Sequence, residues 1–436
     1  MNVLKFGGTS VGSVQNMKIV KNIICDGERK IVVLSAMSGT TNDLIAISNT
    51  IKSSHQDKSY FLIEQLYTKY KNVIKDLLQN KNIVEEAEKF VLSVFEELHS
   101  LETQHDNPLL ERIIVSKGEI LSTHIFSYYL KECNVNSKLI SALDFMRKDA
   151  NDEPDNFYIE QNIKRILQEN ENIEIFITQG FISLDKNGTI DNLNRGGSDY
   201  TASIIGAAID AENIQIWTDI DGFHNNDPRV VTNTKSIEQL SFDEAAELAY
   251  FGAKILHPMT ILPAQRKNIP VWLKNTMQPN ALGTIISNEY KINGIKAIAA
   301  KDNITAINIK SARMFLAHGF LKKVFDVFET YETSIDMITT SEVAVSLTID
   351  DTKNLTEIEN KIAQFSDITI EKNQSIICIV GHNIIQDPIA KEIFKVLTDF
   401  PIRMISYGGS KNNITLLVAD EHKKEIMQTL NKYLFS

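Results

Sequence analysis

Met1-Asn2-Val3-Leu4-Lys5-Phe6-Gly7-Gly8-Thr9-Ser10-Val11-Gly12 opens the chain. An apolar run typical of a strand leads through Lys5 into paired glycines and two hydroxyl residues. Backbone N–H groups of such a loop can close on anionic oxygens, and the lysine can neutralise their charge. The stretch is not a Walker loop, because it lacks the pattern G-x-x-x-x-G-K-[ST]. It is not a dinucleotide fingerprint either, since Thr9 stands where the middle glycine of G-x-G-x-x-G belongs. It predicts a strand followed by an anion-binding loop.

A second loop of this character, Asn194-Arg195-Gly196-Gly197-Ser198-Asp199, precedes the apolar helical segment 200–209. Arg195 offers a planar fork for a carboxylate, and the glycines allow the backbone to approach a ligand closely. Asp199 is either an acid at a helix N-terminus or a group that orients a catalytic lysine. The two loops together indicate an enzyme that handles a nucleotide and a small anion.

Composition narrows the class of protein. The chain has 436 residues, which suggests about three domains, and its net charge of −11 argues against nucleic acid as the main partner. Its three cysteines, Cys25, Cys133 and Cys378, lie far apart and fit a reducing compartment. The N-terminus does not resemble a signal peptide, and no apolar run approaches the roughly 18 residues of a membrane span. We expect a cytoplasmic protein without a membrane partner.

The first 290 or so residues alternate short apolar runs with helical patterns. This alternation predicts an α/β domain with a mostly parallel sheet covered by helices, whose ligands bind beyond the carboxyl ends of the strands. Residues 58–101 have helical periodicity and predict an inserted αα-hairpin, which either packs or acts as a lid. The expected strands lie at 31–34, 138–140, 173–177 and 214–217.

The pattern changes after 283–294. Residues 304–371 read as β-α-β-β-α-β, and residues 376–434 begin a similar series. Two copies of one small α+β unit indicate paired ligand-sensing modules. A single irregular α+β domain is the alternative.

Polar side chains follow several of the apolar runs. Ser35–Asn42 comes after a strand and is suited either to a polar substrate or to capping the next helix. Glu119, in Lys117-Gly118-Glu119, follows the apolar run 113–116. It is either an acid at the start of a helix or a partner for a substrate ammonium.

Two later segments add charged groups. The aspartates of Trp217–Arg229 would position Mg²⁺ or a nucleotide, or they form Asp-Gly and Asp-Pro turns. His224 in this segment either stacks on a base or is an ordinary loop residue. Phe251–Pro258 supplies a further lysine, Lys254, in a glycine-containing turn.

Taken together, these residues resemble the aspartate kinases of the amino-acid kinase family, over nearly the whole chain. The most specific segments are Lys5–Val11, Arg195–Asp199, Thr218–Arg229 and Phe251–Pro258. The resemblance implies a catalytic domain over 1–290, a first ACT domain over 311–375, and a second made of 295–310 plus 376–436. Ile304–Ile309 would then pair with the C-terminal module.

The resemblance also implies roles for individual residues. Lys5, Asp199 and Lys254 would be catalytic. The residues implied around ATP are Lys5, Gly7, Gly8, Thr218, Asp219, His224, Asp227, Arg229 and Lys254. Those implied to hold aspartate are Ser35, Thr41, Glu119 and Arg195. An allosteric lysine site would use Met314, Gly319, Phe320, Leu321, Asp336, Thr340 and Ser341. Glycine usually stands at the position of Asn194, and tyrosine at that of His224.

The implied activity is ATP-dependent phosphorylation of the aspartate side chain, with Mg²⁺ as cofactor and no metal ligands assigned to the protein. Lysine is the implied inhibitor, with threonine as the competing effector, and a homodimer through the ACT domains, or a tetramer, is the implied assembly. The alternatives are another kinase of the family, acting on glutamate or a carbamate, and a non-catalytic amino-acid sensor.

Overall fold

The computed structural model describes residues 1–193, 196–252, 255–289, 293–311 and 318–435. The described chain forms two compact units. The first unit comprises 1–223, 238–242 and 256–290, and the second comprises 224–237, 243–255 and 291–436.

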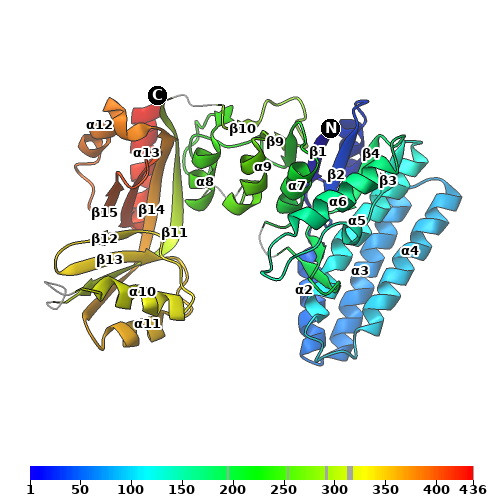
Figure 1. Cartoon of the computed structure of the whole chain (residues 1–436), viewed down its shortest axis with the longest axis horizontal. Helices are drawn as coiled ribbons and strands as arrows, with labels where there is room; N and C mark the ends of the chain where they lie inside the picture. The colour runs from blue at the N-terminus through cyan, green and yellow to red at the C-terminus, as the bar shows by residue number, and fades with distance from the viewer. Residues whose placement is uncertain (194–195, 253–254, 290–292, 312–317, 436) are drawn as a thin grey trace. The chain divides into compact units, whose positions relative to one another are not determined.

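The first unit is built on an eight-stranded sheet with the order β3-β4-β2-β1-β7-β9-β10-β8 (Figure 1). All neighbouring strands run parallel except β9 and β10, so the expected mostly parallel α/β sheet is confirmed. The strands are β1 (Asn2–Phe6), β2 (Lys30–Leu34), β3 (Ser137–Leu139), β4 (Ile175–Gln179), β7 (Ile214–Thr218), β8 (Gln239–Leu240), β9 (Val271–Asn275) and β10 (Thr284–Ile286).

The parallel order brings the carboxyl ends of five neighbouring strands to one edge of this sheet. Strands β4, β2, β1, β7 and β9 end at Gln179, Leu34, Phe6, Thr218 and Asn275. Ligands of open α/β sheets bind at this edge. The Lys5 loop and the segment that starts at Ser35 therefore begin side by side.

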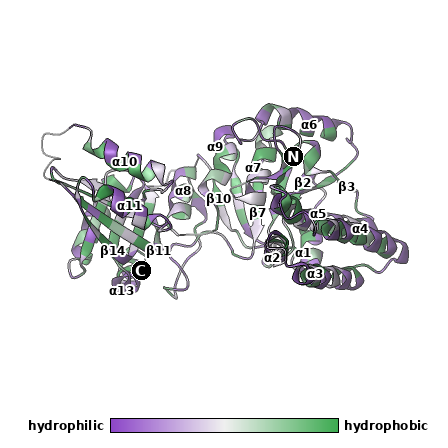
Figure 2. Ribbon diagram, turned by 90° about the horizontal axis from the view of Figure 1, so that it is seen from below, coloured by the Kyte–Doolittle hydropathy of each residue, from purple (hydrophilic) through white to green (hydrophobic). Residues whose placement is uncertain are grey.

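One face of the sheet is covered by a large helical layer whose core includes alternate residues of β1 and β2. Its helices are α1 (Val14–Ile24), α2 (Thr40–Lys52), α3 (Gln56–Leu77), α4 (Lys81–Ser100) and α5 (Leu110–Glu132). Helices α3 and α4 form the expected αα-hairpin, running side by side in Figure 1. They mix hydrophilic and hydrophobic residues in Figure 2, as expected of helices that bury one side only.

Helix α7 (Gly197–Ala208) packs against β1, between α6 (Asn156–Gln168) and α9 (Leu262–Lys267). A short hairpin of β5 (Ile182–Leu184) and β6 (Ile190–Asn192) precedes α7 in the chain. Helix α7 begins within the second glycine loop, so Ser198 and Asp199 lie in its first turn, as the sequence predicts.

The second unit contains a six-stranded sheet with the order β12-β13-β11-β14-β16-β15. Its strands are β11 (Gly294–Lys310), β12 (Ile338–Thr340), β13 (Ala344–Ile349), β14 (Asp367–His382), β15 (Ile402–Tyr407) and β16 (Asn413–Ala419). Its helices are α10 (Phe320–Thr330), α11 (Leu355–Ile362), α12 (Pro388–Val396) and α13 (Asp420–Phe435), and α8 (Phe242–Tyr250) precedes them in the chain.

Two separate cores lie on this sheet, which confirms two α+β modules rather than one irregular domain. Helices α10 and α11 pack on one core with Ile307 and Leu347, and α12 and α13 pack on the other with Ile298 and Ile379. The strand that ends the first expected series, 304–371, and the strand that begins the second, 376–434, are one continuous strand, β14, which is shared by both modules.

Strand β11 is divided between the modules at an irregularity between Lys301 and Ile304. Its first part, 294–301, pairs with the part of β14 that belongs to the C-terminal module. Its second part, 304–310, pairs instead with β13 and with the start of β14. The expectation that Ile304–Ile309 pairs with the C-terminal module is therefore wrong. The alternation of apolar and polar residues in this segment could not distinguish between the two modules, because pairing within either module buries one side of the strand.

In the described part of the chain, no helix combines the length and apolar character needed to cross a membrane.

Candidate active site

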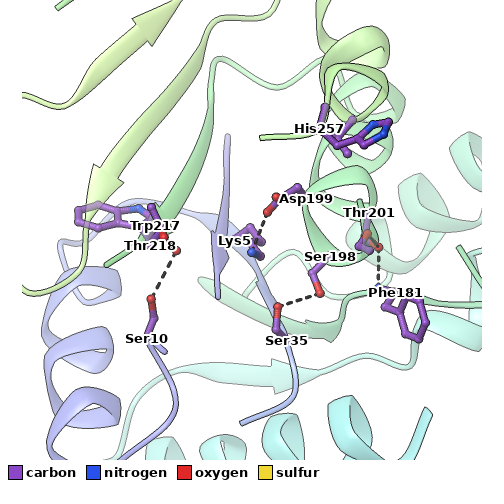
Figure 3. A network of polar contacts seen from close by, with 12 residues as sticks. Lys5, Ser10, Ser35, Phe181, Ser198, Asp199, Thr201, Trp217, Thr218 and His257 are labelled. Carbon is purple, nitrogen blue, oxygen red and sulfur yellow. Dashed lines mark hydrogen bonds and ion pairs between the residues drawn. The ribbon is translucent and has the colours of Figure 1, made fainter. Parts of the chain in front are cut away.

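Lys5 and Asp199 form the central ion pair at the carboxyl edge of the first sheet. Lys5 Nζ lies 2.7 Å from Asp199 Oδ1, and the two side chains are 11% and 18% exposed. Strand β1 supplies the lysine, and the first turn of α7 supplies the aspartate (Figure 3). The reading of Asp199 as a group that orients a lysine agrees with this geometry, although its position at the helix N-terminus is also observed.

The loop after β1 is held tightly against its neighbours. The Gly7 N–H donates to the Trp217 carbonyl, and Ser10 Oγ lies 2.7 Å from Thr276 Oγ1. A Cβ on Gly8 would stand 2.9 Å from the Ala36 carbonyl oxygen, so only glycine fits without displacement of the backbone. The close approach of the loop to Ala36, just after β2, thus explains why residue 8 is a glycine.

Ser35 and Ser198 join the end of β2 to the start of α7. Their hydroxyl oxygens are 2.9 Å apart, and Figure 3 shows them beside the Lys5–Asp199 pair. Gly180 lies directly against Ser198, since a Cβ on this glycine would approach the serine Cβ to 2.3 Å. The sequence marked Ser35 as a candidate but placed Ser198 only as a helix-opening residue.

Glu119 is buried at the same edge. It lies in the interior of α5, because residues 113–116 are helical and the helix begins at Leu110. The alternative that Glu119 is an acid in the first turn of a helix is therefore wrong. Its Oε1 accepts the Ala36 N–H at 3.1 Å, and its Oε2 is buried without a hydrogen-bond partner among the described residues.

Burial raises the pKa of Glu119 to about 7, against the opposing effects of the Ala36 hydrogen bond and the positive charge of Lys5. A buried carboxylate oxygen without a donor is costly, and an ammonium group would satisfy it. Glu119 is therefore suited to a cationic group of a ligand.

Further residues lie at the ends of neighbouring strands. Thr218 closes β7, and its hydroxyl donates to Asp219 at 3.0 Å. Thr41 lies in the first turn of α2, whose N-cap is Gly39 in a left-handed conformation. Neither Thr41 nor Asn42 is the N-cap residue, so helix capping does not account for them.

Sequence reasoning missed the contribution of β9. Lys274, Asn275 and Thr276 follow the alternating Val271-Trp272-Leu273, which was the available signal. Lys274 Nζ lies 5.3 Å from the centroid of a Trp217 ring, and burial lowers the pKa of this lysine. A cation that sequence analysis did not consider thus stands beside the strand that ends at Thr218.

His224, Asp227 and Arg229 belong to the second unit. His224 Nδ1 lies 2.9 Å from Thr234 Oγ1, as in an ordinary polar loop. The Arg229 guanidinium pairs with the Asp227 carboxylate at 2.7 Å and holds the pKa of that carboxyl below its usual range. The arginine side chain is 85% exposed, and its Nε and Nη2 both bond to the Asp227 carboxylate.

The described residues of the expected effector site lie in the first α+β module. Gly319 is the N-cap of α10 with φ +87°, followed by buried Phe320 and exposed Leu321. Thr340 ends β12, and the Ser341 hydroxyl accepts the Ala344 N–H.

Asp336 in the same module already binds an ammonium group. Its Oδ1 accepts hydrogen bonds from Lys301 Nζ and from the Tyr250 hydroxyl, both at 2.7 Å. Its Oδ2 is buried without a hydrogen-bond partner in the described residues. Lys301 also pairs with Asp350 at 2.8 Å.

Arg195, Lys254 and Met314 lie outside the described residues, as does Asn194. Their assigned roles stay predictions.

Comparison with known proteins agrees with this arrangement. The model of the amino acid kinase family matches residues 1–275, and an ACT domain model matches 377–434. The chain is 34% identical to lysine-sensitive aspartokinase 3 of Escherichia coli (strain K12), with 99% of each chain covered.

Solved structures give the same result. E. coli aspartokinase III in complex with aspartate and ADP (R-state) is similar with a TM-score of 0.84 and 33% identity, covering 100% of both chains. The same enzyme in complex with lysine and aspartate (T-state) gives a TM-score of 0.82 at 33% identity, again over 100% of both chains.

The packing of Gly180 on Ser198 yields a first prediction. Gly180→Ala should displace Ser198 and lower the free energy of unfolding by about 1–3 kcal/mol, as overpacking does. Gly409→Ala is the matched control, since the contact nearest to its Cβ is 3.6 Å. Thermal denaturation of both variants measures the difference, and an unchanged melting temperature for Gly180→Ala would contradict the packing.

Proposed function

The chain belongs to the amino acid kinase family and, within it, to the aspartokinases, and we propose that it transfers the γ-phosphate of ATP to the side-chain carboxylate of L-aspartate. The products are 4-phospho-L-aspartate and ADP, and the reaction opens the route to lysine, threonine and methionine. The observation that carries this proposal is the Lys5–Asp199 pair at the carboxyl edge of the parallel sheet, between the loops that follow β1 and β2.

The chemistry needs electrostatic compensation more than a base. The side-chain carboxylate of aspartate has a reference pKa of about 3.9 and is ionised at neutral pH. It must approach a negatively charged phosphate, and two like charges about 4 Å apart repel by roughly 4 kcal/mol at an effective dielectric constant of 20. Lys5 offsets this repulsion and stabilises charge in the transition state, while Asp199 fixes the position of the ammonium.

The nucleotide is assigned to the loop after β1 and to the segment after β7. Gly7 and Gly8 form the loop around the phosphates, with the Gly7 N–H bound to the Trp217 carbonyl, and Lys5 neutralises the phosphate charge. The other residues assigned to ATP are Thr218, Asp219, His224, Asp227, Arg229 and Lys254. Lys254 joins Lys5 as a second catalytic cation in this assignment.

Aspartate is assigned to the loop after β2 and to α5. Glu119 binds the α-ammonium group through its unpartnered Oε2. Ser35, Thr41 and Arg195 hold the carboxylates, and the arginine grips one of them bidentately. These contacts place the side-chain oxygen in line with the γ-phosphate.

Mg²⁺ is assigned as the companion of ATP. When bound, it would supply positive charge that offsets part of the negative charge of the phosphates. The described residues contain no group of three or more His, Cys, Asp or Glu that could hold a metal ion.

Lysine is the assigned feedback inhibitor, with its ammonium group on Asp336. Lys301 forms ion pairs with both Asp336 and Asp350. It can therefore retain its ion pair with Asp350 when the ammonium of a free lysine replaces it at Asp336. Gly319, Phe320, Leu321, Thr340, Ser341 and Met314 complete the assigned pocket. Inhibition requires that lysine favour a less active state, with a coupling free energy of roughly 1–3 kcal/mol.

We assign to the protein a homodimer, or a tetramer built from it, in which the subunits contact each other through the first α+β module. Strand β12 is an edge strand, and it carries half-exposed Ile338 close in sequence to Val343. Leu321 and Phe325 on α10 are similarly exposed.

The cytoplasm is the assigned location of the protein, because free cysteines such as Cys25 stay reduced there.

The proposal is tested by a coupled ADP-release assay with aspartate, glutamate and acetylglutamate as acceptors. Of the three acceptors, we expect only aspartate to support ADP release. We expect added lysine to lower this rate and added threonine to leave it unchanged. Turnover only with another acceptor would assign a different kinase of the family, and no turnover with any acceptor would support the amino-acid sensor.

Lys5→Met keeps the length of the side chain and removes its charge. We expect kcat to fall by about 10²- to 10³-fold, as for the loss of a donor that stabilises transition-state charge. Lys52→Met is the control, because this half-exposed lysine of α2 pairs with Glu111 of α5. Near-normal turnover of a folded Lys5→Met enzyme would refute the role of Lys5.

The raised pKa of Glu119 predicts proton release on aspartate binding. The free enzyme holds a proton on Glu119 below about pH 7, and the aspartate ammonium favours the ionised carboxylate, so binding near pH 6.5 should release a large part of one proton. The KM for aspartate should rise as the pH falls from 8 to 6.

Calorimetry in buffers of different ionisation enthalpy measures this release. Glu119→Gln should abolish the proton release and weaken aspartate binding at every pH. If the wild-type KM stays constant from pH 6 to 8 with no proton release, Glu119 does not bind the ammonium group.

A further inference from the structure

Asp191 is a buried carboxylate that joins two cations outside the residues assigned so far. Its side chain is 3% exposed. Its Oδ1 lies 2.9 Å from Arg112 Nη1, and its Oδ2 lies 2.5 Å from Lys148 Nζ. The Lys148 side chain is itself 2% exposed, and its ammonium also reaches the Asn192 carbonyl and Asp152. Such a three-way junction fixes the position of the segment that carries the carboxylate.

That segment leads directly into the second glycine loop. Asp191 is the central residue of β6, opposite Ser183 of β5, and the chain continues through Leu193 toward Gly196. The Leu193 N–H donates to the Phe181 carbonyl, so the hairpin is closed immediately before the loop. The position of Leu193, the last described residue before Gly196, is therefore fixed by the hairpin.

The other end of the loop is tied to the same hairpin. Phe181 has a φ of +65°, which is uncommon for a residue with a side chain, and its N–H donates to Thr201 Oγ1 at 2.9 Å (Figure 3). Thr201 lies on α7, two residues after Asp199. The hairpin thus contacts the chain both before and after the loop.

Arg112 connects this hairpin to the helix that carries Glu119. Both residues lie on α5, seven positions apart, which is about two helical turns or 10.5 Å along one face. The Arg112–Asp191 pair therefore anchors β6 to the face of α5 that presents the buried glutamate. The pair thus ties the hairpin that precedes α7 to the helix that carries Glu119.

We propose that Asp191, held by Arg112 and Lys148, is a positioning residue for aspartate binding. It does not touch the substrate and acts through the hydrogen bond between Phe181 of the hairpin and Thr201 of α7, the helix that carries Ser198 and Asp199. A buried ion pair contributes little net stability compared with apolar packing, but it defines one geometry. The inference rests on the proposed function, since it concerns the aspartate site of that reaction.

The test compares Asp191→Asn with Asp26→Asn. Asp26 also pairs with a buried lysine, Lys30, but this pair stands at the amino-terminal start of β2, at the opposite edge of the sheet. Both variants should lose some thermal stability. Only Asp191→Asn should raise the KM for aspartate, by about tenfold or more, because small displacements of positioning groups have large kinetic effects. The KM for ATP should change less than twofold.

Arg112→Gln keeps the test decisive if Asp191→Asn fails to fold, because the Arg112 side chain is 46% exposed. It should raise the aspartate KM in the same way, and Arg112→Lys should restore part of the loss. An unchanged aspartate KM in a folded Arg112→Gln enzyme, or an equal rise in both KM values, would overturn the inference. Absence of aspartate kinase activity in the wild-type protein would instead overturn the proposed function.

Discussion

The ion pair between Lys5 and Asp199 is the interaction on which the site depends. It joins the central strand of the sheet to the first turn of α7, so it links the two glycine loops across the carboxyl edge. The ammonium is held mostly out of water beside one carboxylate, which fixes its position, and a lysine ammonium has three N–H donors with which to bind more than one acceptor. A cation that is prepositioned in this way can act on a developing charge without first reorganising solvent.

Several parts of this arrangement could be predicted from sequence. The strand before Lys5, the helix that starts at Ser198 and Asp199, and the αα-hairpin all have local signals in composition and periodicity. The resemblance to aspartate kinases placed these elements in one family fold, which the comparisons confirm. Local signals were sufficient here because β1 is a continuous buried run and the helices α3 and α4 each bury one periodic face.

Other parts depend on contacts that no local pattern encodes. The helical state of 113–116 was missed because a buried helix reads as a continuous apolar run, as a buried strand does. The division of β11 at Lys301 depends on which strands pair with each half. The junction at Asp191 joins residues distant in sequence, and aspartate alone gives no sign of two buried partners.

A double-mutant cycle on Lys5 and Asp199 addresses the central ion pair most directly. The kcat of Lys5→Met, Asp199→Asn and the combined variant would be measured against the wild type under saturating MgATP and aspartate. If Asp199 acts by holding Lys5, its substitution should cost little more once the lysine is gone, so the double variant should match Lys5→Met within about threefold. Losses that multiply in the double variant would show that the two groups act independently, and this would contradict the role given to their pairing.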